Sequence, residues 1–199
     1  IMRPLTGHHM SRRTQAERRA ETQQRVLESA CRLFGEKGYN NTSVDEIAAD
    51  CELTTRPIYH YFGNKQALFT ATVEATSARI SAGRETDAGQ PPQTILQHWR
   101  HFLSLCDDPH FRQIVLIDAP NILGRERWAI SPSVIGVQQR MLQYAGDSKE
   151  EQFRLVLLGR MIIAALTEAA LMIADADDIE LAKQQSERVV QQLLGQMEL

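Results

Sequence analysis

Two short helices joined by a tight turn are predicted over residues 43–62, and this segment constrains the fold more than any other. Ser43 and Glu46 have capping-box spacing, in which each side chain bonds the backbone N–H of the other residue at a helix start. The apolar residues that follow have the i, i+3, i+4, i+7 spacing of one buried helical face: Val44, Ile47, Ala48 and Cys51. The first of the two helices is therefore expected to pack on a larger core.

The second short helix follows a connection through Glu52 and Leu53. Thr54 or Thr55 can cap its start. Pro57 falls within the first turn, where a missing N–H costs no helical hydrogen bond. The spacing thus predicts two helices that meet at an abrupt turn.

One face of the second helix is apolar and the other is rich in hydrogen-bonding groups. Ile58 and Phe62 lie four residues apart and are expected to face the core. The opposite side carries donors and flat rings: Thr55, Arg56, Tyr59, His60 and Tyr61. Arginine can bond a guanine edge with two hydrogen bonds, and hydroxyl groups can reach phosphates. Such a surface is typical of a helix-turn-helix that reads the major groove, although an ordinary solvated helix is the alternative for this stretch alone.

Charge and cysteine usage narrow the class of protein. The net charge of −3 argues against a protein that coats nucleic acid by bulk charge, so any nucleic-acid site is expected to be local. Cys31, Cys51 and Cys106 form no CxxC or Cys/His pattern. We expect them to be small apolar residues of a cytoplasmic protein.

Residues 42–69, TSVDEIAADCELTTRPIYHYFGNKQALF, resemble the DNA-binding region of the TetR (tetracycline repressor) family. The preceding segment RVLESACRLFGEKGYNNTSV is similar to the first helix of that region and the turn after it. The resemblance implies an all-α fold, with an N-terminal three-helix helix-turn-helix domain and a larger C-terminal helical domain for ligand binding and dimerisation. The family usually has glycine where this chain has Glu52, a residue that disfavours a positive φ angle, so we expect a slight readjustment of the turn and no loss of function.

The resemblance also implies which residues bind DNA. The recognition helix would contribute Thr54, Thr55, Arg56, Pro57, Tyr59, His60 and Tyr61. The phosphate contacts would come from Thr42, Ser43 and Lys65. Arg12 and Arg13 could extend an arm to the DNA, but a disordered tail is an equally good interpretation.

The chain is expected to divide into three parts. Residues 1–10, with the letters GHHM, read as a leader or tag remnant, and whether they are native is open. Residues 11–64 would form the DNA-binding domain and residues 65–199 the ligand-binding and dimerisation domain. Helices are predicted over residues 14–37, 65–84, 93–106, 109–118 and 134–144, and Pro120 is expected to break the fourth of these.

The segment 150–174 is apolar enough to suggest a membrane span, but Arg160 and Glu168 within it make insertion costly. Burial on two sides, against its own domain and against a second subunit, explains it better. Residues 178–197 have a further apolar stripe. Two such helices from each subunit would form the four-helix bundle of a homodimer, which would also suit a palindromic DNA operator.

The middle helices carry aromatic and methionine side chains that suit an apolar effector, although plain core is the alternative for each. These candidate pocket residues are Trp99, Phe102, Phe111, Trp128, Met141, Tyr144 and Met161. His98 and His101 sit three apart and could bind a metal, but a solvated helix face is favoured, so no metal and no cofactor are expected.

No catalytic motif is present, and the chain is not expected to be an enzyme. The favoured function is a cytoplasmic, homodimeric repressor that a small apolar molecule releases from its operator. Two alternatives stay open. One is a DNA-binding regulator or activator that needs no effector, and the other is a helical ligand-binding protein with a vestigial DNA-binding end.

Overall fold

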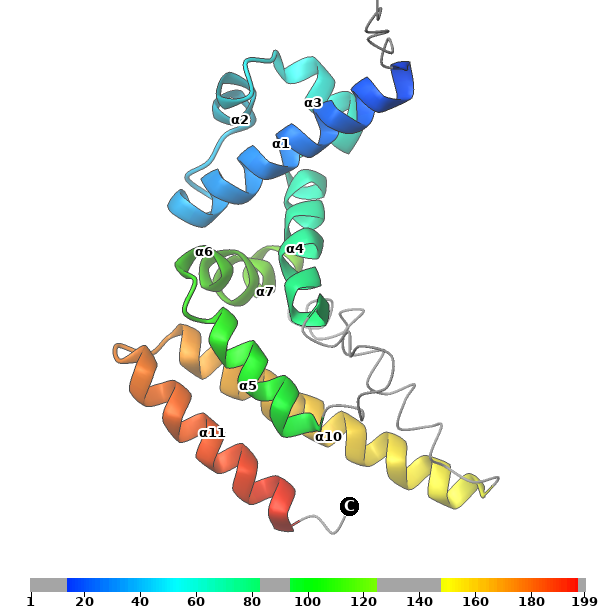
Figure 1. Cartoon of the computed structure of the whole chain (residues 1–199), viewed down its shortest axis with the longest axis vertical. Coiled ribbons are helices and arrows are strands. Elements are labelled where there is room, and N and C mark those ends of the chain that lie inside the picture. Colours follow the sequence, from blue (N-terminus) through cyan, green and yellow to red (C-terminus); the bar gives the residue numbers. More distant parts are fainter. Residues whose placement is uncertain (1–13, 83–93, 125–147, 197–199) are drawn as a thin grey trace, which may run out of the picture.

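A computed structural model describes residues 14–82, 94–124 and 148–196 of the 199-residue chain. Within these ranges every regular element is helical and no strand occurs, as the sequence predicts. The first three helices form one end of the molecule, and α4 connects them to the helices of the C-terminal half (Figure 1). The predicted helix over residues 134–144 lies outside the described residues, as do residues 1–13.

Helix α1 (Gln15–Lys37) begins and ends as the sequence predicts. Thr14 and Glu17 form a capping box at its start, and Gly38 stops it with a φ angle of 78°. The buried face is formed by Val26, Ser29, Ala30, Leu33, Phe34 and Gly35. This face is the surface on which the next three helices and part of the C-terminal half pack.

Helices α2 (Val44–Asp50) and α3 (Thr55–Phe62) form the predicted helix-turn-helix. Glu52 adopts a φ angle of 54°, and it is the one non-glycine residue with positive φ in the described ranges. The turn is closed by the N–H of Leu53, which donates to the carbonyl of Ala48 at 2.8 Å. The expected readjustment of the turn is not seen, because Glu52 itself holds the positive φ angle that glycine would adopt without a steric cost.

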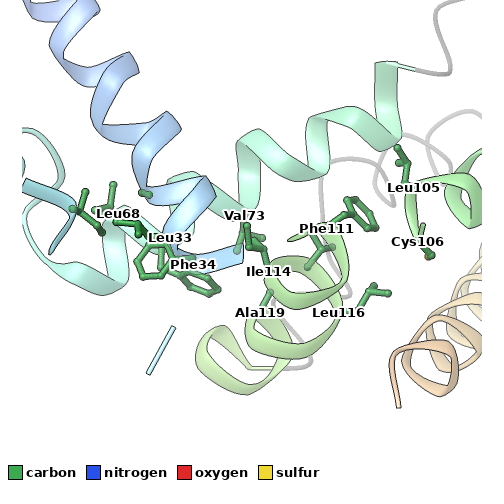
Figure 2. Close-up of a cluster of buried hydrophobic side chains, with 14 of the residues drawn as sticks. Leu33, Phe34, Leu68, Val73, Leu105, Cys106, Phe111, Ile114, Leu116 and Ala119 are labelled. Carbon is green, nitrogen blue, oxygen red and sulfur yellow. The ribbon is translucent and has the colours of Figure 1, made fainter. Parts of the chain in front are cut away.

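Helix α4 (Lys65–Ala82) joins the two halves through one continuous core. Its side chains Leu68 and Phe69 are fully buried, and Val73 is 8% exposed. Figure 2 shows these apolar contacts running from Phe34 of α1 past Val73 to Ile114 in the C-terminal half. The N-terminal helices α1 to α3 thus share one core with the C-terminal half of the chain.

The next helices are α5 (Ile95–Leu105), α6 (Pro109–Phe111), η1 (Arg112–Asp118) and α7 (Ala119–Leu123). The last three form one helical stretch, so the prediction that Pro120 breaks the helix is wrong. Pro120 lies in the first turn of α7, where its missing N–H costs least. The segment before it, η1, is a π-helix, in which the N–H of Ala119 bonds the carbonyl of Ile114 five residues earlier.

Helices α10 (Lys149–Ala174) and α11 (Ile179–Gln196) pack side by side, as Figure 1 shows. By length and composition, α10 is apolar enough to cross a membrane, and it is the one such helix within the described ranges. Only 22% of its most apolar window is buried inside the chain. Helix α10 therefore presents a large apolar surface that the described residues do not cover.

Replacing Glu52 by glycine is expected to raise the free energy of unfolding by about 1 kcal/mol, because glycine adopts positive φ without the steric cost of a Cβ atom. Urea-induced unfolding followed by circular dichroism measures the change. Glu52→Ala is the matched control, since it removes the carboxylate but keeps the Cβ. Equal stabilisation by both variants would assign the effect to charge and contradict the prediction.

Candidate nucleic-acid interface

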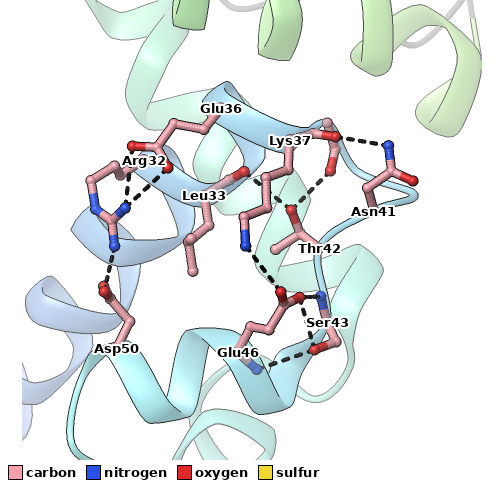
Figure 3. Close-up of polar contacts among 10 residues, drawn as sticks. Arg32, Leu33, Glu36, Lys37, Asn41, Thr42, Ser43, Glu46 and Asp50 are labelled. Atoms are coloured by element: carbon pink, nitrogen blue, oxygen red, sulfur yellow. Dashed lines mark hydrogen bonds and ion pairs between the residues drawn. The ribbon is translucent and has the colours of Figure 1, made fainter.

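The scaffold of the helix-turn-helix is a set of ion pairs and hydrogen bonds between α1 and α2 (Figure 3). The hydroxyl of Ser43 accepts the N–H of Glu46, and the Glu46 carboxylate accepts the N–H of Ser43, which confirms the predicted capping box. Lys37 donates to Glu46 at 3.0 Å. Arg32 pairs with both Glu36 and Asp50. These contacts fix the short helix α2 on the longer α1.

These bonds also change the acidity of two carboxyl groups. The backbone N–H of Ser43, followed by the Lys37 ammonium, lowers the pKa of Glu46 to about 2. Hydrogen bonds from Ser29 and Arg32 lower the pKa of Asp50. Both groups are therefore charged at neutral pH and bind their partners most strongly in that form.

Helix α3 presents the predicted polar surface. Ile58 is 1% exposed and Phe62 packs at the edge of the core, so these residues anchor the helix as predicted. Tyr59 is 50% exposed, and Arg56 and His60 are also exposed on the solvent side. The exposed side chains of Arg56, Tyr59 and His60 thus lie away from the buried Ile58.

The remaining residues of the helix lie around this surface. Thr55, Pro57 and Tyr61 are half-buried, and the rings of His60 and Tyr61 are 5.3 Å apart. Thr54 occupies the residue before the helix and is exposed, but its side chain makes no capping hydrogen bond. The predicted capping role of a threonine hydroxyl is therefore not seen at Thr54.

Thr42 does not belong to the exposed surface, and its hydroxyl is not free for the predicted phosphate contact. The side chain is 1% exposed. Its hydroxyl donates to the carbonyls of Leu33 and Gly38, at 3.1 and 2.9 Å. The residue closes the turn after α1 from inside, whereas its neighbour Ser43 is exposed.

Lys65 begins α4 as predicted, but its ammonium lies over the ring of Tyr39, 4.2 Å from the ring centre. Burial lowers the pKa of Lys65, and the charges of Glu46 and Asp118 act in the opposite direction. A lysine held in this way contacts an aromatic face and is half-buried.

The candidate pocket residues divide into three groups. Trp99, Phe102 and Phe111 form one aromatic cluster. The ring centre of Phe102 is 5.0 Å from that of Trp99 and 6.0 Å from that of Phe111. The indole N–H of Trp99 is buried without a hydrogen-bond partner. Met161 is 62% exposed on α10, so it does not line an interior pocket of the described chain. Trp128, Met141 and Tyr144 lie outside the described residues.

Burial and backbone hydrogen bonds account for the three cysteines and for His98 and His101. Cys51 and Cys106 are buried and Cys31 is half-buried. Burial raises the pKa of Cys31 and raises that of Cys106 to about 12, so these thiols are poor nucleophiles. His98 and His101 bond backbone carbonyls of Thr94 and Arg79. In the described ranges, no group of three potential metal ligands comes together.

Sequence reasoning missed two features at the junction of the two halves. One is Asp118, which is buried and accepts a hydrogen bond from the backbone of Tyr39. The other is a cavity of about 350 Å³ between α1, α4 and α6. Its walls include Leu27, Cys31, Thr76, Arg79, Phe111 and Ile114. No local pattern reveals either feature, because the partners lie far apart in the chain. The one available signal in the sequence was an acidic residue, Asp118, between the apolar residues Ile117 and Ala119.

Two parts of the chain match models of known protein families. Residues 92–197 match the domain described as "Tetracyclin repressor-like, C-terminal domain". Residues 26–72 match "Bacterial regulatory proteins, tetR family". The chain belongs to the TetR family. Members of this family are DNA-binding transcriptional regulators, and the first match alone covers more than half of the chain.

Individual relatives agree with the family assignment. The transcriptional regulator YerO of Bacillus subtilis is 30% identical over 109 residues, which are 52% of this chain and 37% of YerO. The transcriptional repressor NicS of Pseudomonas putida is 29% identical over 83 residues, which are 40% of this chain and 39% of NicS. The chain thus spans well under two thirds of the length of these curated relatives.

Solved structures extend the likeness to the whole fold. A TetR-family transcriptional regulator from Pectobacterium atrosepticum has a TM-score of 0.60 and 29% sequence identity, with 92% of this chain and 96% of the other covered. The TetR-family fold, an N-terminal helix-turn-helix followed by a helical C-terminal domain, is therefore confirmed.

Acid is expected to weaken the α1–α2 scaffold. The pKa of Glu46 is lower in the folded chain, about 2, than its ordinary value of 4.5, so its stabilising effect is present above pH 4.5 and is lost as the pH falls toward 2. Thermal unfolding of the wild type and Glu46→Gln at several pH values tests this. The difference in melting temperature should shrink between about pH 5 and pH 2.

Glu74→Gln, an exposed carboxylate on α4, provides the control. A gap between the wild type and Glu46→Gln that stays constant from pH 7 to pH 3 would count against the assigned role of Glu46.

Proposed function

We propose that this TetR-family chain is a ligand-responsive repressor that binds a palindromic operator as a homodimer and is released by a small, mainly apolar effector. The observation that carries the proposal is the exposed surface of Arg56, Tyr59 and His60 on α3, a helix anchored by buried Ile58. A helix held from one side and open on the other suits insertion into the major groove. Action on chromosomal DNA implies a cytoplasmic protein.

In this proposal Arg56 reads a base and the residues around it position the helix. A guanidinium can donate two parallel hydrogen bonds to the edge of a guanine. The hydroxyl groups of Ser43, Thr54 and Thr55 are within or beside the exposed surface and would bind phosphates. Pro57, Tyr59, His60 and Tyr61 would provide further contacts, and Lys65 would bind a phosphate after leaving the Tyr39 ring. Thr42 is left out because its hydroxyl is used inside the domain.

The dimer interface is assigned to the last two helices, α10 and α11. One side of α10 is exposed at Leu157, Met161, Ala164, Ala165 and Met172, which share a helical face. The two alanines at its centre allow a second helix to approach closely. Large apolar side chains exposed on a folded chain mark a surface that a partner covers. The exposed large side chains on both helices are Phe153, Leu157, Met161, Met172, Leu181, Val189 and Leu193.

The effector would bind in the C-terminal domain, residues 65–199, while residues 11–64 bind DNA. The aromatic cluster of Trp99, Phe102 and Phe111 favours an apolar ligand body. The unpartnered N–H of Trp99 favours a ligand with one hydrogen-bond acceptor. The repressor assignment is supported by the name of the relative NicS. Release would follow if the effector binds better to a conformation whose two recognition helices are wrongly spaced.

Selection of duplexes from a random DNA library tests the proposal. The protein should enrich one inverted repeat at about 0.15 M salt, where non-specific phosphate contacts are weakened. Its half-sites should lie about 34 Å apart, or a multiple of that distance. A folded, dimeric protein that enriches no motif would overturn the proposal and favour a ligand-binding protein with a vestigial DNA-binding end. A reporter carrying the repeat at its promoter then separates repression from activation.

Replacing Arg56 by alanine is expected to weaken specific binding by about 1–3 kcal/mol and to relax the preference at one base pair, because a bidentate contact is lost. Fluorescence anisotropy with the enriched duplex measures the change. Arg100→Ala is the matched control, since Arg100 is an exposed arginine of α5 that pairs with Glu187. Equal losses from the two variants would contradict a base-reading role for Arg56.

Replacing Met161 by glutamate is expected to convert the dimer to monomers at micromolar concentration, because a charge would be buried at the centre of the proposed interface. Light scattering coupled to size exclusion measures the mass. Lys149→Glu, in the exposed first turn of α10, is the control for added negative charge. A Met161→Glu protein that stays dimeric would move the interface away from this face.

A further inference from the structure

The two halves of the molecule meet closely where the His110 side chain of α6 packs on the backbone of α1 at Gly35. An added Cβ at Gly35 of α1 would lie 2.6 Å from the Cβ of His110 in α6, which is too close for any side chain. Gly35 is buried there. Helix α6 therefore packs closely on the C-terminal part of α1, with no room for a side chain at residue 35.

Close to this contact, the carboxylate of Asp118 in the C-terminal half bonds the turn that follows α1. Asp118, the last residue of η1, is 9% exposed. Its Oδ2 accepts the backbone N–H of Tyr39 at 2.7 Å, across 79 residues of sequence. Tyr39 directly follows Gly38, where α1 ends, and its turn leads to Ser43 at the start of α2.

A carboxylate is an unexpected choice at this place. The C-terminal end of a helix carries partial negative charge, which disfavours an acid beside it. Burying a carboxylate also costs free energy unless it is hydrogen-bonded or paired. Here the N–H of Tyr39 and the charge of nearby Lys65 offset that cost. The acid is therefore best explained by what it holds in place.

Asp118 influences both elements that lead to the DNA-binding surface. Through Tyr39 it holds the turn before α2. Through its charge it favours the ammonium form of Lys65, which begins α4 and lies on the Tyr39 ring. The η1 helix that carries Asp118 also packs on α10, the helix assigned to the dimer interface. One residue thus lies between the dimer-forming part of the chain and the helix-turn-helix.

We propose that Asp118 is a positioning residue for DNA binding, because its carboxylate orients the Tyr39 turn and the start of α2 on the C-terminal half. The DNA-binding role rests on the proposed function. The residue touches no DNA in this arrangement, so its effect on affinity is indirect and comes from the placement of the helix-turn-helix.

Asp118→Ala and Asp118→Asn separate this role from general stability. Alanine leaves the N–H of Tyr39 without a partner, whereas the asparagine oxygen can still accept it. Backbone amide exchange over residues 39–51 measures how firmly the turn and α2 are held. Affinity for the enriched duplex measures the consequence. Asp177→Asn, an exposed acid before α11, is the control for the loss of one negative charge.

Asp118→Ala should exchange at least about tenfold faster at Tyr39 and along α2, and bind the duplex about five- to tenfold more weakly. It should remain dimeric, and Asp118→Asn should stay close to the wild type. Faster exchange at Tyr39 alone, with unchanged affinity, would overturn the proposal and leave a local contact.

The exchange data keep the two proposals separate. If the wild type enriches no duplex, the proposed function fails. The positioning role is tested independently of DNA, because an Asp118→Ala protein with wild-type exchange through α2 would overturn it. If Asp118→Ala does not fold, Asp118→Asn decides: a loss of affinity with unchanged exchange at α2 would contradict the proposal.

Discussion

The apolar contact between α1 and α4 is the interaction on which the rest of the structure depends. Phe34 and Phe69 are fully buried, with ring centres 5.2 Å apart in an edge-to-face arrangement. The ring of Tyr39 stacks on the ring of Phe34, with ring centres 5.7 Å apart. Removing a buried phenyl ring costs a domain about 3–5 kcal/mol, which is a large part of its total stability. These three rings pack α1, the turn after it and α4 against one another. The ring of Tyr39 also holds the ammonium of Lys65.

This contact explains how α3 can be so exposed. An eight-residue helix is too short to be stable alone, and only Ile58 of α3 is buried. The helix persists because α1, α2 and α4 hold it from the other side. Its outer face is then free to carry Arg56, Tyr59 and His60, side chains that add nothing to the core. Stability and the proposed recognition of DNA are in this way divided between two faces of one helix.

Local rules predicted well wherever a structural feature depends on neighbouring residues. The capping box of Ser43 follows from residue spacing and is present. The turn at Glu52 was expected to readjust, but Glu52 holds the positive φ angle instead. One error arose where distant residues decide. Thr42 was expected at the surface, but the carbonyl of Leu33 draws its hydroxyl inward. A second error was local: Pro120 was expected to end a helix, but it lies in the first turn of α7, which follows η1 directly.

The sequence by itself determined the all-α class, the caps and turns of the helix-turn-helix and the candidate reading surface, because these depend on periodicities and on contacts a few residues apart. Only the tertiary structure decided which of those residues are exposed, that Lys65 lies on the ring of Tyr39, and that Asp118 reaches the turn after α1. The physical reason is that burial and hydrogen-bond partners at such positions come from elements far along the chain. Their meeting is set by the packing of helices and not by any local pattern.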